Sequence, residues 1–253
     1  MFRVDLNCDL GESFGAYEIG MDGQVIPHIT SANVACGYHA SDPVVMEKTV
    51  ALCKAHGVSM GAHPGFPDLM GFGRREMKIT PAEAKAYVLY QLGALDAFCR
   101  AAGMKMNHVK PHGALYNMAG KDKALAGAIC QAIGAYDRTL VLLALAGSEM
   151  VRAGLEAGLS VAQEVFADRG YEEDGSLVNR SKPGAMIHDE REAISRVVRM
   201  VTEGKVKAVT GKDIPVRADS VCIHGDGPNA LAFAQRIREA LTGAGVQLLP
   251  LKG

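Results

Sequence analysis

Four short apolar runs in the first half of the chain each end in polar residues that are capable of chemistry. They occupy residues 4–12, 32–39, 58–65 and 106–113. Segments with helical periodicity separate them, so we interpret the runs as parallel strands whose C-terminal ends meet at one pocket. In α/β barrels and open α/β sheets, ligands bind and catalytic residues gather at that end. The pattern therefore predicts an enzyme whose pocket is built largely from residues 1–112.

Strand-like runs recur along the whole chain, with helical segments between them. They lie near residues 3–8, 31–36, 58–62, 106–110, 139–145, 160–166 and 219–223, with a weaker one at 246–249. Helix starts are signalled by Asp42 before Pro43, by a capping box at Thr80 and by Asp189. This alternation predicts a single α/β domain over residues 1–253. Seven good strands and a weak eighth favour a closed or nearly closed β/α barrel over an open sheet.

Two connections are longer than barrel loops need to be. Residues 64–79 and 167–187 are rich in glycine and charge, and both follow strand ends that should face the pocket. Long irregular connections in compact domains often form lids or binding loops, so we expect both to lie near the pocket. Residues 205–218 are predicted to form a small hairpin outside the barrel.

Composition argues against several classes of function. The 253 residues are 48% hydrophobic with a formal net charge of −1, which supports a large core and offers no basic patch for nucleic acid or a membrane. The apolar runs are too short to span a bilayer, and the N-terminal residues lack the pattern of a signal peptide. The six cysteines have no disulfide-like spacing. We therefore expect a cytoplasmic protein without a nucleic-acid or membrane partner.

The first strand carries three polar side chains on one face. Asp5, Asn7 and Asp9 alternate along it, and burying such a stripe is costly unless it is paired or hydrogen-bonded. We interpret Asp5, the deepest of the three, as a structural hydrogen-bond partner. Asp9 and Glu12 lie at the mouth of the predicted barrel and are better candidates for catalysis or ligand binding.

A later strand carries basic groups on one face, where His108, Lys110 and His112 alternate. A lysine beside carboxylates can bind an anionic substrate or stabilise oxyanion charge. His112 is placed to act as a general acid or base near neutral pH. His39 and His63 stand at two other strand ends, and this recurrence favours a functional role over a purely structural one.

Two alternatives stay open at this point. Asp9, His39 and His63 together would suit Zn²⁺ or a similar ion, although they come from separate strands and no local spacing motif supports a metal. Residues 221–230 form a predicted strand, Gly-rich turn and helix start, which is either an anion site or only a tight turn. The chain contains no Gly-x-x-x-x-Gly-Lys-Ser/Thr loop, so a nucleotide would not be held in that way.

Six blocks of the sequence carry a family resemblance. They are residues 5–12, 32–40, 61–68, 109–116, 164–169 and 222–226. On these blocks the chain resembles the 5-oxoprolinase A-subunit family, also called the LamB/YcsF family, from about residue 3 to about residue 250. The resemblance implies an irregular β/α barrel of the kind shared with sugar deacetylases and glycoside hydrolases.

The resemblance also implies an activity and partners. The chain would be one subunit of an enzyme that converts 5-oxo-L-proline to L-glutamate with ATP hydrolysis, and two partners, the B- and C-subunits, would take part in using the ATP. Asp9 or His112 would activate water, while His39 and His63 would orient it or protonate the ring nitrogen. Lys110 and Arg169 would hold the substrate carboxylate or phosphoryl charge. The full set of substrate-binding candidates is Asn7, Glu12, Asn33, Lys110, Arg169 and His224.

Two other functions compete with this one. The first is a metal-dependent, deacetylase-like amide hydrolase that needs a divalent ion and no ATP. The second is a non-catalytic subunit that binds 5-oxoproline and hands it to its partners. The concentration of ionisable residues at the strand ends favours catalysis, because binding a simple anion needs fewer of them.

Overall fold

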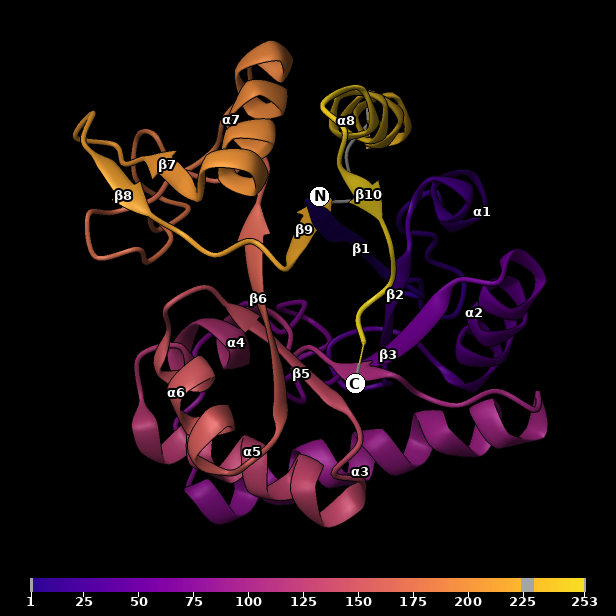
Figure 1. Cartoon of the computed structure of the whole chain (residues 1–253). Coiled ribbons are helices and arrows are strands. Elements are labelled where there is room, and N and C mark those ends of the chain that lie inside the picture. The colour runs from indigo at the N-terminus through magenta and orange to yellow at the C-terminus, as the bar shows by residue number, and fades with distance from the viewer. Residues whose placement is uncertain (1, 224–229, 253) are drawn as a thin grey trace.

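The computed structural model describes residues 2–223 and 230–252, in which seven parallel strands close into a barrel surrounded by helices (Figure 1). The ring contains β1 (Arg3–Leu10), β2 (Ser31–Ala35), β3 (Ser59–His63), β4 (His108–Val109), β5 (Val141–Leu145), β6 (Ser160–Phe166) and β9 (Ser220–Ile223). Each strand pairs with the next, and β9 closes the ring by pairing with β1, where Asn7 lies opposite Cys222. The predicted α/β barrel is confirmed.

The weak eighth strand forms but is not part of the ring. β10 (Gln247–Leu248) pairs with Arg3 and Val4 at the start of β1. The chain then crosses the end of the barrel where the strands begin (Figure 1). There Leu251 packs with Val141, Leu143 and Ala162, so apolar side chains close this end.

Helices cover the outside of the barrel. The longer ones are α2 (Pro43–His56), α3 (Pro81–Ala101), α5 (Lys123–Tyr136), α6 (Glu149–Glu156), α7 (Glu190–Glu203) and α8 (Ala230–Gly243), and the short ones are α1 (Asp22–Val25), η1 (Ile26–His28) and α4 (Gly113–Ala119). The predicted helix starts are confirmed: Asp42 and Asp189 accept backbone N–H groups, and Thr80 forms a capping box with Glu83. The predicted hairpin is also present, as antiparallel β7 (Lys205–Lys207) and β8 (Asp213–Pro215).

Within residues 2–223 and 230–252, every helix is too short or too polar to cross a membrane.

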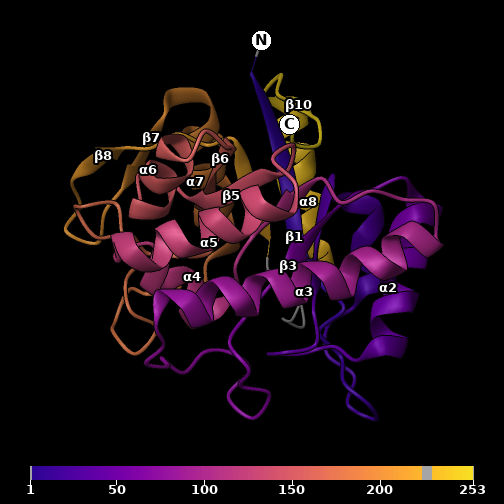
Figure 2. The same ribbon diagram turned by 90° about the horizontal axis from the view of Figure 1, so that it is seen from below.

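The two ends of the barrel differ. Figure 2 shows both termini at one end, whereas long connections between strands and helices extend from the other. The two long connections are each anchored by a fully buried aromatic ring, Phe66 in one and Tyr171 in the other. The hydroxyl of Tyr171 also accepts the backbone N–H of Phe166 at the end of β6. These contacts fix both loops over the end at which the strands terminate.

Beyond the apolar end, the inside of the barrel is polar along β1. Along β1, Leu6 and Cys8 pack in the core between strands and helices, whereas the alternating residues face inward. The carboxylate of Asp5, the deepest, accepts hydrogen bonds from the hydroxyls of Thr30, Ser31 and Ser220. This confirms Asp5 as a structural hydrogen-bond partner. α/β barrels are usually filled with branched apolar side chains, so a polar interior depends on such bonds being complete.

Gly61 on β3 provides a test of packing inside the barrel. A Cβ at this position would lie 2.3 Å from the buried ring of His108. We expect Gly61→Ala to lower the free energy of unfolding by about 1–3 kcal/mol, because the ring or strand must shift. In contrast, Gly93→Ala in α3, where a Cβ would meet no atom within 4 Å, should raise it by up to about 1 kcal/mol. Urea unfolding of both variants measures the difference, and a fully stable Gly61→Ala protein would contradict this packing.

Asp5 should leave a signature in the pH dependence of stability. Burial raises the pKa of Asp5 to about 6, although three hydroxyls hydrogen-bond to it. Because the folded pKa lies above the unfolded value of about 4, the folded state binds the extra proton and loses stability as pH rises through 6. Between pH 5 and pH 8, the free energy of unfolding of the wild type should fall by about 1 kcal/mol more than that of Asp5→Asn. Urea unfolding at both pH values tests this, and parallel behaviour of the two proteins would show that Asp5 is ionised throughout.

Candidate functional site

A buried ion-pair network forms the floor of the site. Lys110 follows β4, and its ammonium nitrogen lies 2.9 Å from Asp9 Oδ1, 2.9 Å from Glu164 Oε1 and 3.1 Å from Asn7 Oδ1. Burial by itself would lower the pKa of Lys110, but Asp9, Cys222 and Glu164 together outweigh it and hold that pKa well above its usual value. Lys110 is therefore charged, and its three N–H donors have protein acceptors.

Asp9 connects this floor to the mouth of the barrel. Its Oδ1 accepts hydrogen bonds from Asn33 and Lys110, and its Oδ2 lies 3.4 Å from His63 Nε2. Burial opposes ionisation, but the neighbouring His63 and the charged Lys110 together outweigh it and hold the pKa of Asp9 well below its usual value. Asp9 is therefore an ionised carboxylate that lines the pocket.

Two predicted substrate-binding residues, Asn7 and Asn33, lie beneath the pocket. Both are fully buried, and Asn33 donates to Asn7 Oδ1 at 2.7 Å. Burial and the charge of Lys110 lower the pKa of His108 to about 3. The neutral ring donates its Nε2–H to Asn33 Oδ1 over 2.8 Å. This amide layer orients Asp9 from below, and direct contact of Asn7 or Asn33 with substrate stays a prediction.

Three histidines and Glu12 meet at the mouth. His39 follows β2, His63 ends β3 and His112 immediately precedes α4. His63 Nε2 lies 3.0 Å from His112 Nδ1, and His39 Nε2 lies 3.0 Å from Glu12 Oε1. The rings of His39 and His112 are stacked, with centroids 3.7 Å apart. Burial holds the pKa of His39 and of His112 well below its ordinary value, so both rings are neutral.

The connection of residues 64–79 holds His112 in place. The ring nitrogen Nε2 of His112 lies 2.8 Å from the carbonyl oxygen of Phe72, and its backbone N–H donates to Pro64. Gly113 permits this close approach: it has φ +55°, and a Cβ there would lie 2.6 Å from the carbonyl oxygen of Gly73. The loop therefore sets both the position and the orientation of the imidazole.

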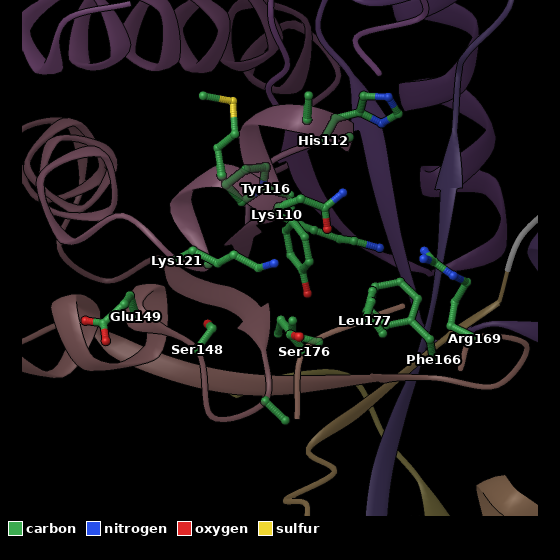
Figure 3. Close-up of a pocket in the computed structure, with 18 of the residues that line it drawn as sticks. Lys110, His112, Tyr116, Lys121, Ser148, Glu149, Phe166, Arg169, Ser176 and Leu177 are labelled. Atoms are coloured by element: carbon green, nitrogen blue, oxygen red, sulfur yellow. The ribbon is translucent and has the colours of Figure 1, made fainter. Parts of the chain in front are cut away.

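These groups line one end of a pocket of about 790 Å³. Asp9, Glu12, His63, Lys110 and His112 contribute to its wall. The pocket continues past Tyr116 and Phe166 toward Lys121, Ser148 and Glu149, and the side chain of Lys121 reaches into it (Figure 3). Both long connections also contribute lining residues, namely Arg74, Glu76, Arg169 and residues 174–180.

Three residues of the network were not singled out by the sequence analysis. Tyr116 donates its hydroxyl to Glu164 Oε2 at 2.7 Å, and Cys222 Sγ lies 3.2 Å from the ammonium of Lys110. Glu164 could have been found, because it is the one acidic residue in the apolar strand β6. Tyr116 lies on a helix and Cys222 lies in an apolar strand, so only the folded barrel shows that they contact charged groups.

Arg169 and His224 complete the predicted set. Arg169 donates to the backbone carbonyls of Val178 and Ala185, at 2.7 and 3.2 Å, and so binds its own loop together. Its guanidinium also lies on the side of the pocket toward Lys110 (Figure 3), and a contact with substrate stays a prediction. His224 and the rest of the turn 224–229 lie outside the described residues.

The grouping at the mouth differs from the triad proposed from the sequence. Glu12, His39, His63 and His112 each place a donor atom within 4.8 Å of the others. Asp9 stands beside this group and approaches it through His63, with which it makes an ion-pair contact. The carboxylate grouped with the histidines is therefore that of Glu12, whereas the sequence analysis grouped Asp9 with His39 and His63.

Comparison with known proteins gives consistent results. The family model described as the LamB/YcsF family matches residues 4–253. The chain is 62% identical over 251 residues to a protein of Clostridium beijerinckii that is named as the A-subunit of 5-oxoprolinase, covering 99% of this chain and 98% of that protein. It is 57% identical over 248 residues to the protein of the same name from Bacillus subtilis, covering 98% and 96%.

Solved structures agree with this relationship. The "Lactam Utilization Protein" from Thermus thermophilus superposes with a TM-score of 0.94 at 50% identity, covering 98% of this chain and all of that one. Concanavalin B superposes with a TM-score of 0.50 at 11% identity, which shows a likeness of fold alone. The resemblance recognised in the sequence is confirmed, and the chain belongs to the LamB/YcsF family.

Proposed function

We propose that this chain is the A-subunit of an ATP-dependent 5-oxoprolinase, which opens the lactam ring of 5-oxo-L-proline to give L-glutamate. The observation that carries the proposal is the ionised Asp9, which faces a large pocket beside neutral imidazoles. The names of the relatives, which refer to 5-oxoprolinase and to lactam utilization, support both the substrate class and a multisubunit enzyme. The partners would be the B- and C-subunits.

The chemistry requires an activated lactam, because a five-membered cyclic amide is stable toward water. In this scheme ATP, used with the partner subunits, transfers its γ-phosphoryl group to the lactam oxygen. One water then adds to the ring carbon, the C–N bond breaks and the nitrogen takes up a proton. A second water hydrolyses the resulting acyl phosphate, so that the products are L-glutamate, ADP and inorganic phosphate.

The residues of this chain suit the hydrolytic steps. Asp9 would orient the attacking water and accept its proton, and Lys110 and Asn33 hold the carboxylate in place from below. The N–H donors of Lys110 are engaged by Asp9, Glu164 and Asn7. Arg169 and Lys121, which lie along the pocket, are therefore better placed to receive the substrate carboxylate or a phosphoryl group.

Replacement of Asp9 tests the proposal. Asp9→Asn should lower the rate of glutamate formation at least about 100-fold in a mixture with the B- and C-subunits and ATP, because it removes the base. Binding of 5-oxoproline should change much less than turnover. Glutamate release and substrate affinity are measured on the same protein, with circular dichroism to check folding.

Asp189→Asn is the matched control. Asp189 caps α7 and accepts the backbone N–H of Glu192, and asparagine caps helices equally well, so activity should be retained. Loss of affinity rather than turnover in Asp9→Asn would favour a non-catalytic binding subunit. Glutamate formation by this chain without ATP or partners would contradict the ATP-coupled scheme and favour the metal-dependent hydrolase.

A further inference from the structure

The mouth of the barrel contains an unusual contact between two imidazoles. His63 Nε2 and His112 Nδ1 lie 3.0 Å apart, which is the distance of a hydrogen bond. Both residues are more than nine-tenths buried, and both line the pocket. A hydrogen bond requires that one of the two nitrogens carries a proton.

The remaining contacts of the rings show where their protons lie. His63 Nδ1 lies 2.7 Å from the backbone oxygen of Lys110, and His112 Nε2 lies 2.8 Å from that of Phe72. A carbonyl oxygen only accepts, so each of these nitrogens is the N–H of its ring. In a neutral imidazole the other nitrogen then carries a lone pair. When both rings are neutral, the two facing nitrogens, His63 Nε2 and His112 Nδ1, are therefore both acceptors.

The atoms around this pair are also acceptors. Glu12 Oε1 lies 3.5 Å from His112 Nδ1, and Asp9 Oδ2 lies 3.4 Å from His63 Nε2. Two lone pairs and two carboxylates that converge in a buried site repel one another unless a positive centre lies between them. Such a centre is either an extra proton or a metal cation.

We propose that His63 Nε2, His112 Nδ1 and the carboxylate of Glu12 form a binding site for one divalent transition-metal ion of the Zn²⁺ type. Nitrogen and oxygen ligands about 2.0–2.1 Å from a tetrahedral Zn²⁺ lie about 3.3 Å from one another. The separations of 3.0 Å between the two imidazole nitrogens and 3.5 Å from His112 to Glu12 bracket that spacing. Two imidazoles and one carboxylate also leave a fourth position open toward the pocket.

The surrounding groups have the arrangement that metal ligands need. Each histidine ligand donates its second nitrogen to a backbone carbonyl, which fixes the tautomer and the direction of the lone pair. His39 stands behind Glu12, with its Nε2 3.0 Å from Oε1, and does not line the pocket. His39 is therefore a positioning residue, which orients the carboxylate rather than binding the ion.

The metal site goes beyond the proposed function, because its geometry does not depend on the substrate. A bound Zn²⁺ would polarise a carbonyl or lower the pKa of water beside Asp9. The test of the metal site measures metal binding by this chain, and it needs neither 5-oxoproline nor the partner subunits. The proposed function and the metal site can therefore fail independently.

The experiment uses the full chain after dialysis against a chelator. Titration with Zn²⁺ in a calorimeter should show one equivalent bound, and Co²⁺ should give the visible absorption of a tetrahedral complex. His63→Ala and His112→Ala should each lose more affinity than the about 10–100-fold expected for His39→Ala, an outer partner. The control is His56→Ala at the exposed end of α2, which should bind as tightly as wild type.

Two results would overturn the proposal. One is the absence of stoichiometric Zn²⁺ and Co²⁺ binding by the wild-type chain, which would leave an extra proton between His63 and His112 as the positive centre. The other is unchanged affinity in both His63→Ala and His112→Ala, which would place the ion elsewhere. The Co²⁺ spectrum of the wild type needs no variant, so misfolding of a variant leaves the test intact.

Discussion

The buried ammonium group of Lys110 is the charge on which the site depends. It lies within a closed ring of strands, 3% exposed, and contacts Asp9 and Glu164 at 2.9 Å. Removing one partner of a buried pair generally costs about 3–5 kcal/mol, because the other charge is left without compensation. The lysine therefore allows two carboxylates to stay inside a barrel that would otherwise be filled with apolar side chains.

The other polar groups form layers around this charge. At the end where the strands begin, Leu251 and its apolar neighbours exclude water. Above them the hydroxyls of Thr30, Ser31 and Ser220 satisfy Asp5. The amides of Asn7 and Asn33 then connect that layer to Asp9. Polarity thus increases toward the end where the strands terminate, and there the ionised Asp9 lines the pocket together with His63 and His112.

The two long connections position side chains that the strand ends alone do not. Strand ends bring Asp9 and His63 together, but the carbonyl of Phe72 decides which nitrogen of His112 carries the proton. Arg169 similarly ties its own connection together through Val178 and Ala185 while remaining at the pocket wall. Both loops therefore fix the position of a side chain at the pocket wall through backbone carbonyls, which are acceptors with fixed positions.

The sequence by itself determined the strands, the main helix caps and the inward-facing residues of β1. These features follow from period-two alternation and from capping chemistry near Asp42, Thr80 and Asp189, which are local effects. The candidates Asp9, Glu12, His63 and His112 were identifiable because strand ends of a parallel barrel converge. That β10 stays outside the ring is not a local property, because ring closure depends on how β9 meets β1.

Only the tertiary structure decided which polar groups pair. Glu164, Tyr116 and Cys222 come from three different elements, and their contacts around Lys110 arise when the ring closes. The sequence grouped Asp9 with His39 and His63, whereas the fold places Glu12 among the three histidines. The reason is physical: alternation specifies the face on which a side chain lies, but distances across a barrel depend on strand register and on loops far away in sequence.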